Sequence, residues 1–196
     1  ASAVSAVGNG LKGWVSAAMD TQKAMITLKN TMKFKGNGKD FDYVSNSMQK
    51  LAKDTNANTE DALELSTTFI GLGDAAKKAV GKTEALVKAN QAFGGTGEQL
   101  KGVVQAYGQM SAAGKVTAEN IGQLTDNNTA LGSSLKDTIM KMNPLLQQYG
   151  SFNDAVSEGA VTMGMLDKAM EKMANGSGGG VKTIGDAWDS LSLIHI

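Results

Sequence analysis

A helix stop followed at once by a helix start constrains the fold of this chain more than any other feature. Residues 111–124 read SAAGKVTAENIGQL. Gly114 is suited to the left-handed conformation that ends a helix, and Thr117 is suited to cap the helix that follows. Ile121 and Leu124 then begin an apolar face three residues apart. The run therefore predicts two helices joined by a short polar turn.

The same pattern recurs 45 positions later in the sequence. The run GAVT at 159–162 repeats the stop and the cap. Leu166 and Ala169 stand where Ile121 and Leu124 stand in the first copy. The pattern holds no group capable of chemistry, and it predicts helical hairpins that stack on one another.

Helical periodicity continues along most of the chain. Residues 3–33 predict one long helix, whose expected apolar positions are Leu11, Trp14, Val15, Ala18, Met19, Met25, Ile26 and Met32. Shorter helices are expected at about 40–54, at 59–72 with Thr59 as the cap, from Thr83 to about Phe93, from Leu100, from Thr117 to about 127, from near Ser133, and after Thr162. No window shows the alternation of a strand. The predicted fold is all-α: a multi-helix array of about nine short helices stacked as helical hairpins after a long N-terminal helix.

Side chains suited to helix caps support these boundaries. Thr96 with Gln99, and Ser151 with Asp154, have the spacing of a capping box. Pro144 follows a break at Asn143 and suits a first helical position.

Composition excludes several classes of function. Aromatic residues make up 5% of the chain, so the core must be built from Ala, Leu, Val and Met. The net charge is zero and all nineteen basic residues are Lys, so we expect no specific nucleic-acid recognition. The chain has no Cys, which removes disulfides and thiolate chemistry. No run approaches the roughly 20 apolar residues of a membrane span.

Three local motifs resemble functional sites, but each lacks a residue or an element that the site requires. Residues 54–58 resemble the start of a calcium loop, but Thr59 and Leu65 stand where Gly and Glu are required. Residues 71–76 match a loose dinucleotide fingerprint, but a helical pattern precedes them instead of a strand. Residues 35–39 resemble the tail of a phosphate loop, but no Ser or Thr follows the Lys.

Titratable residues give no sign of catalysis. The single His, His195, lies in the last six residues, so a Ser-His-Asp triad is excluded. We expect every carboxylate on a polar face or in a first helical turn, with no raised pKa, and Lys77 and Lys78 as a solvated pair. The sequence therefore predicts no catalytic, cofactor-binding or metal-binding residue, and a protein that is not an enzyme.

Composition divides the chain into four segments. We predict a long helix and linker at 1–38, a helical domain at 39–175, and a Gly/Ser joint with the start of another helix at 176–190. Residues 191–196 (LSLIHI) resemble a translated sequencing adapter and are left out of the fold prediction together with His195.

The order of several short motifs resembles a known family. They are SMQKLAKDT at 47–55, FIGLG at 69–73, ANQAFGGT at 89–96, YGQM at 107–110, GKVTAE at 114–119 followed by QL at 123–124, and GAVT at 159–162 running on to Leu166. From about Ser45 to Ser190 the chain resembles the N-terminal tape measure domain of phage tail tape measure proteins.

The resemblance implies a structural virion protein whose length sets tail length while tube subunits polymerise around it. The implied partners are tail tube and tail assembly proteins, with self-association as a further option. The implied locations are the phage tail and, during assembly, the cytoplasm of the bacterial host. This segment would be the globular helical part and not the ruler. The alternative from another class is a secreted or surface helical-bundle interaction protein.

Overall fold

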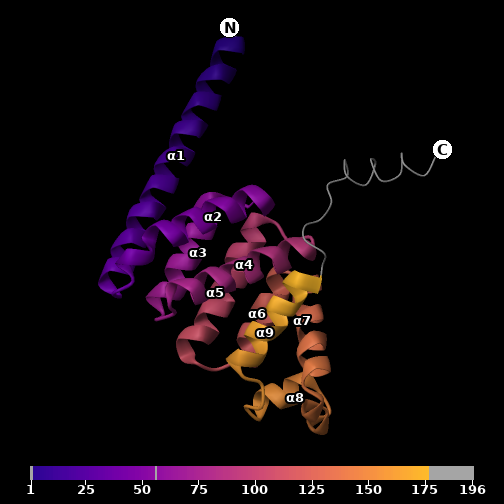
Figure 1. Cartoon of the computed structure of the whole chain (residues 1–196). Helices are drawn as coiled ribbons and strands as arrows, with labels where there is room; N and C mark the ends of the chain where they lie inside the picture. The colour runs from indigo at the N-terminus through magenta and orange to yellow at the C-terminus, as the bar shows by residue number, and fades with distance from the viewer. Residues whose placement is uncertain (1, 56, 177–196) are drawn as a thin grey trace, which may run out of the picture.

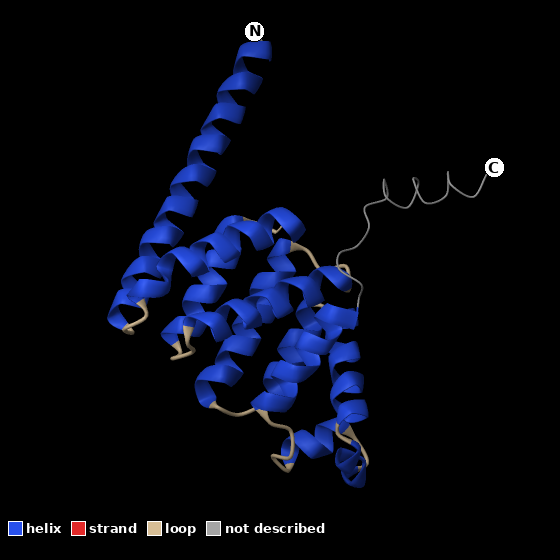
Figure 2. Cartoon of the chain, in the orientation of Figure 1, coloured by secondary structure: helices blue, strands red, loops and turns tan. Residues whose placement is uncertain are grey.

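The computed structural model describes residues 2–55 and 57–176, with side chains described from residue 18 onward. Every regular element in this part of the chain is a helix (Figure 2). The elements are α1 (Ser2–Phe34), η1 (Gly38–Asp40), α2 (Phe41–Thr55), α3 (Thr59–Gly71), α4 (Ala76–Ala92), α5 (Gly97–Ala113), α6 (Ala118–Asn127), α7 (Thr129–Met142), η2 (Pro144–Tyr149), α8 (Phe152–Ser157) and α9 (Met163–Gly176). The all-α prediction is confirmed, including the long first helix.

Neighbouring helices fold back on one another and build the body of the molecule (Figure 1). Helices α2 and α3, α3 and α4, α5 and α6, and α6 and α7 pack as consecutive pairs. Helix α9 then returns to pack against α4 and α7, and the second half of α1 packs along α3. The first half of α1 extends beyond the body (Figure 1).

The two repeated stops end their helices with the same hydrogen bonds. Gly114 has φ +63° and Gly159 has φ +69°, a conformation that a residue without a side chain adopts at low cost. The Gly114 amide donates to Ser111 O at 3.2 Å and the Lys115 amide to Met110 O at 3.1 Å. The corresponding bonds after α8 are 2.9 and 2.8 Å. Both stops are Schellman motifs, and the same pattern closes the helices that end near Gly36, Gly73 and Gly94.

The predicted cap of the following helix is confirmed in both copies. The Thr117 hydroxyl accepts a hydrogen bond from the Asn120 amide at 3.2 Å, and the Thr162 hydroxyl accepts one from the Met165 amide at 3.3 Å. Between stop and cap, Val116 and Val161 are buried. Each turn is therefore anchored by one apolar side chain as well as by its polar ends.

The capping box of Thr96 and Gln99 is also confirmed, with both reciprocal bonds present. The second predicted box forms only in part. The Ser151 hydroxyl accepts from the Asp154 amide at 3.1 Å, but it also lies 2.6 Å from the Asp154 carboxylate. The carboxylate therefore contacts the hydroxyl of Ser151, and no bond from it to the Ser151 amide is found.

One predicted cap and two predicted helix starts are wrong. Helix α3 begins at Thr59 as predicted, but its cap is Asn58 rather than Thr59, because the Asn58 side chain reaches the Glu60 amide at 3.0 Å. Helix α7 begins at Thr129 rather than near Ser133. Its cap is Asn128, whose side chain accepts from the Leu131 amide at 3.0 Å.

Helix α4 begins at Ala76 rather than Thr83. Its N-cap, Ala75, makes no side-chain hydrogen bond, so the sequence carries no cap signal there. Thr83 instead lies buried within the helix, where its hydroxyl donates to Ala79 O at 2.8 Å.

The core is centred on two aromatic rings among many small and aliphatic side chains. Phe69 of α3 and Tyr107 of α5 are buried and meet edge to face, with ring centroids 5.6 Å apart. The apolar positions predicted after the two repeated stops, Ile121 and Leu124 in α6 and Leu166 and Ala169 in α9, are all buried. In α1, however, Met19 is 63% exposed and Ile26 is 54% exposed. The helix buries Ala24, Leu28 and Met32 against the body.

A buried amide pair ties three helices together. The Asn128 side chain donates to Asn90 Oδ1 at 3.0 Å, and the Asn90 side chain donates to Thr96 O at 3.1 Å. Asn90 lies in α4, Thr96 caps α5, and Asn128 caps α7. These buried polar groups are satisfied by one another and fix the register of their helices.

Thr117→Ala tests the first repeated cap. Loss of the hydroxyl leaves the Asn120 amide without this partner, so the free energy of unfolding should fall by about 1 kcal/mol. Urea denaturation of the whole chain measures the change. A midpoint equal to that of the unaltered chain would argue against the cap.

Gly132→Ala tests the crossing of α6 and α7, with Gly122→Ala as its matched control. A Cβ at residue 132 would lie 2.6 Å from the Thr125 Cα, whereas one at residue 122 meets nothing within 4 Å. Gly122→Ala should therefore stabilise the chain by up to about 1 kcal/mol, because alanine favours a helix. Gly132→Ala should destabilise it by about 1–3 kcal/mol. Equal effects in thermal denaturation would contradict this close approach.

Candidate functional site

The motif-like segments form helix ends in the structure. Thr55 closes α2, with its hydroxyl donating to Leu51 O at 2.6 Å, and Asn58 caps α3. The glycines of residues 71–76 lie at the end of α3 and in the turn after it, so a helix precedes them as predicted. The described residues include no group of three or more His, Cys, Asp or Glu side chains that could hold a metal ion. The prediction of no catalytic, cofactor or metal residue stays a prediction.

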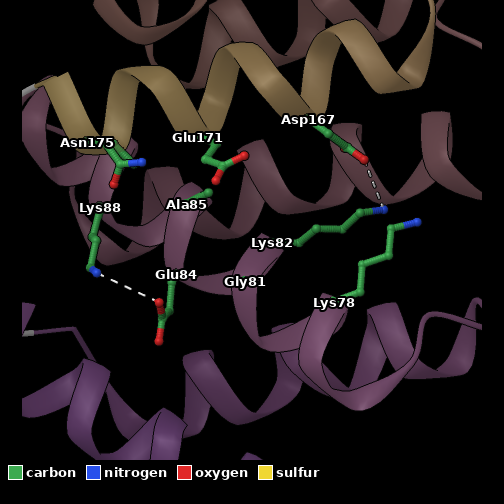
Figure 3. A pocket seen from close by; sticks show the side chains of 10 residues that line it. Lys78, Gly81, Lys82, Glu84, Ala85, Lys88, Asp167, Glu171 and Asn175 are labelled. Carbon is green, nitrogen blue, oxygen red and sulfur yellow. Dashed lines mark ion pairs between the residues drawn. The ribbon is translucent and has the colours of Figure 1, made fainter.

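A groove between α4 and α9 is lined mainly by charged side chains (Figure 3). Its volume is about 350 Å³. Charged side chains from both helices line it: Lys78, Lys82, Glu84, Lys88, Asp167 and Glu171. The α4 wall carries three lysines and one glutamate, and the α9 wall carries Asp167 and Glu171, so this α4–α9 groove is zwitterionic rather than selective for one charge.

Lys82 is the shared cation of an ion-pair network beside this groove. Its ammonium lies 2.9 Å from Asp74 and 3.5 Å from Asp167. It also lies 5.4 Å from the centroid of the Phe69 ring, within the range of a cation–π contact. The Lys82 side chain is 11% exposed, so these contacts replace most of its water. The network joins the α3–α4 turn, α4 and α9.

One sequence prediction about charge is wrong here, and another is incomplete. The Lys78 side chain is 60% exposed, as predicted for a solvated residue, but its ammonium also lies 2.9 Å from the Asp74 carboxylate. Asp167 does have a raised pKa, caused by burial against α4 and only partly offset by Lys82. The four-residue spacing of Asp74 and Lys78 is a signal that sequence reasoning missed. The burial of Asp167 depends on a distant helix and carries no local signal.

The two carboxylates beside Lys82 have pKa values displaced in opposite directions. Burial alone would raise the pKa of Asp74, but hydrogen bonds from Lys78 and Lys82 outweigh it and lower that pKa. For Asp167 burial prevails and raises the pKa. One Asp167 oxygen, Oδ1, is buried and has no hydrogen-bond partner among the described residues. The network is therefore well paired on the Asp74 side and poorly paired on the Asp167 side.

A second groove, between α3 and α5, is mainly apolar. Its volume is about 400 Å³, and we call it the α3–α5 groove. Leu65, Leu100 and Val104 line it together with Glu64 and the ion pair of Asp61 and Lys101. A groove of this kind, between two helices with a charged wall, can receive an apolar side chain of another protein.

The comparison with known families decides what kind of protein this is. A family model described as tape measure protein matches residues 16–192.

The chain belongs to the tape measure protein family.

Three relatives in this family come from lactococcal phages. Probable tape measure proteins of Lactococcus phage p2 and Lactococcus phage SK1 are each 80% identical to this chain over 191 residues. The tape measure protein of Lactococcus phage F4-1 is 79% identical over 191 residues. Each alignment covers 97% of this chain. The resemblance seen in the sequence is thus confirmed.

This tape measure chain spans only part of its relatives. It covers 19% of the phage p2 and phage SK1 proteins and 52% of the phage F4-1 protein. No solved structure matches it significantly. None of the described helices combines the length and the apolar character that crossing a membrane requires.

Asp74→Asn and Asp167→Asn should affect stability in different ways. The first variant deprives Lys78 and Lys82 of their carboxylate partner, so the free energy of unfolding should fall by about 1–3 kcal/mol at pH 7. The second removes a carboxylate whose charged form is disfavoured by burial, so stability should be unchanged or slightly higher.

The stability lost in Asp74→Asn should depend on pH. Because the fold lowers the pKa of Asp74, its contribution is present at neutral pH and is lost as the pH falls through the folded-state pKa. The deficit of Asp74→Asn should therefore shrink below about pH 4. Urea denaturation at pH 7 and pH 3 measures both effects. An equal loss of stability in the two variants at pH 7 would contradict the proposed difference in pairing.

Proposed function

We propose that this chain is a structural module of a phage tail, not an enzyme, and that the protein containing it sets tail length and scaffolds assembly of the tail tube through protein–protein contacts. The observation that carries the proposal is the family match over residues 16–192. The relatives that cover nearly all of this chain are tape measure proteins of phages, which supports the same role.

The short, folded-back helices support different roles for different parts of the full-length protein. A continuous helix rises about 1.5 Å per residue, which suits a ruler. In this chain the helices after α1 are short and fold back on one another, so each residue adds little length. We therefore assign this segment to a compact contact module and the measuring role to other parts of the protein.

The partners proposed for this module are tail tube and tail assembly proteins, which it would meet in the host cytoplasm during assembly and retain in the finished tail. Several large apolar side chains remain exposed on its surface and support a role in contacts. They are Met19, Ile26, Phe34, Tyr43, Leu72 and Leu145. No observation favours the alternative of a secreted or surface helical bundle.

Tail length in a phage that carries this segment tests whether the measuring role lies outside it. Leu124→Ala removes a fully buried side chain of α6 and should destabilise the module by about 2–5 kcal/mol. We expect fewer assembled tails, each of normal length, by negative-stain electron microscopy. An in-frame deletion elsewhere in the same gene should instead shorten tails by about 1.5 Å per deleted residue. Normal tail length after every such deletion would refute the ruler role. Tails shortened by Leu124→Ala would refute the assignment of this segment.

A further inference from the structure

We propose that two copies of this chain bind head to tail, with the end of α1 in one copy inserted into the α3–α5 groove of the next. The inserted part is Phe34 with its neighbours Lys33 and Lys35, and we call it the α1 tip. The inference goes beyond the proposed function, because it concerns contact between copies, and its failure would leave the role in tail length untouched.

The α1 tip presents an exposed apolar side chain on an ordered backbone. Phe34 is 87% exposed, more than any other large apolar residue among those whose side chains are described. The backbone around it is held by hydrogen bonds from the Lys35 amide to Thr31 O at 2.9 Å and from the Asn37 amide to Met32 O at 2.8 Å. Because the helix end is ordered before binding, Phe34 would lose little conformational entropy on docking.

The α3–α5 groove has the chemistry to receive this side chain. Leu65 and Leu100 are nearly fully buried where they line it, and Val104 lies beside them, partly buried. The volume of about 400 Å³ admits one aromatic ring without unfolding either helix. Burial of the Phe34 ring against these three aliphatic side chains would remove the largest exposed apolar surface of the tip from water.

Charges on the two surfaces are complementary. Lys33 and Lys35 are exposed on either side of Phe34 in the sequence, and neither forms an ion pair with a described residue. Glu64 lines the groove on α3, and Glu60 lies about one helical turn before it on the same helix. Neither forms an ion pair within the described part of the chain. The arriving lysines would pair with these glutamates and fix the orientation of docking.

The carboxylates near the groove also favour a basic partner. Desolvation raises the pKa of Glu60, and repulsion from Glu64 and other nearby carboxylates raises it further. This negative charge is only partly balanced, because Lys101 already lies 3.0 Å from Asp61. A partner that brings two ammonium groups would relieve the repulsion, whereas an acidic partner would increase it.

The geometry of the contact is heterologous. The tip belongs to the end of α1, and the groove lies between α3 and α5, so each copy offers both surfaces at different places (Figure 1). A contact between two different surfaces lets copies add one after another, to a closed ring or an open chain. A two-fold symmetric dimer would need the same surface on both sides and does not arise from this contact.

Sedimentation velocity of the whole chain tests the proposal. The unaltered chain should associate with increasing concentration, and less so at high salt, because screening weakens the Lys–Glu pairs. Phe34→Ala should weaken association at least about ten-fold, the effect expected for loss of one buried aromatic side chain. Ile26→Ala is the matched control, since it removes an exposed apolar side chain from the same helix outside the tip. It should leave association unchanged.

A mixing experiment distinguishes this contact from other modes of association. Phe34→Ala lacks the tip but keeps the groove, and Glu60→Lys/Glu64→Lys lacks the acidic wall but keeps the tip. Each variant alone should associate at least about ten-fold more weakly than the unaltered chain, because its copies lack one of the two surfaces. A mixture of the two should associate through the tip of one and the groove of the other, with folding checked by circular dichroism. The variant that combines Phe34→Ala with Glu60→Lys/Glu64→Lys has neither surface. It should therefore bind neither of the two variants above.

A charge-reversed chain restores the match in charge. Lys33→Glu/Lys35→Glu alone and Glu60→Lys/Glu64→Lys alone should each associate weakly, whereas one chain that carries all four substitutions should associate with itself again. Restored association of that chain would support the docking described above. A chain that stays monomeric to about 100 µM would overturn the proposal, as would association that survives Phe34→Ala or is lost in Ile26→Ala. Failure of the folded charge-reversed chain to associate would overturn it too.

Discussion

Two backbone hydrogen bonds around a left-handed glycine close each of five helices, and the rest of the structure depends on them. At Gly114 and Gly159 the bonds satisfy carbonyl groups that a helix end leaves unpaired. The chain then turns within a few residues, and Thr117 or Thr162 starts the next helix. Because the stops recur, no helix after the first grows long, and helices joined by such turns, such as α3 and α4 or α5 and α6, pack on one another. The repeated turn therefore gives the chain a compact helical body.

Contacts between helices distant in the sequence fix how the short helices pack together. Lys82 joins the α3–α4 turn to α9, and the Asn90–Asn128 pair joins α4 to α7. A buried polar group that loses its partner is costly, so these groups favour one arrangement of the helices over others with similar apolar contacts. In a core with few aromatic rings, such polar pairs supply part of the specificity that large side chains supply elsewhere.

The sequence predicted the fold best where the signal was local. The stop at Gly114, the cap at Thr117 and the Thr96 capping box depend on residues close in the chain, and all are confirmed. Prediction failed at Ala76, where a helix starts without a capping side chain, and on α1, where apolar residues occupy more than one face. The raised pKa of Asp167 could not be predicted, because it arises from burial against a helix some 85 positions away. Family membership, carried by ordered local motifs, was predictable.

The central claim is that this tape measure segment is a compact helical module and not a stretch of extended ruler. Small-angle X-ray scattering of the monomeric chain tests it most directly. A compact chain of this length has a radius of gyration of about 16 Å, and the projecting half of α1 should raise that value modestly. One continuous helix of the same length would extend about 290 Å. A compact profile with a short extension agrees with the account, and a rod-like profile approaching that length would contradict it.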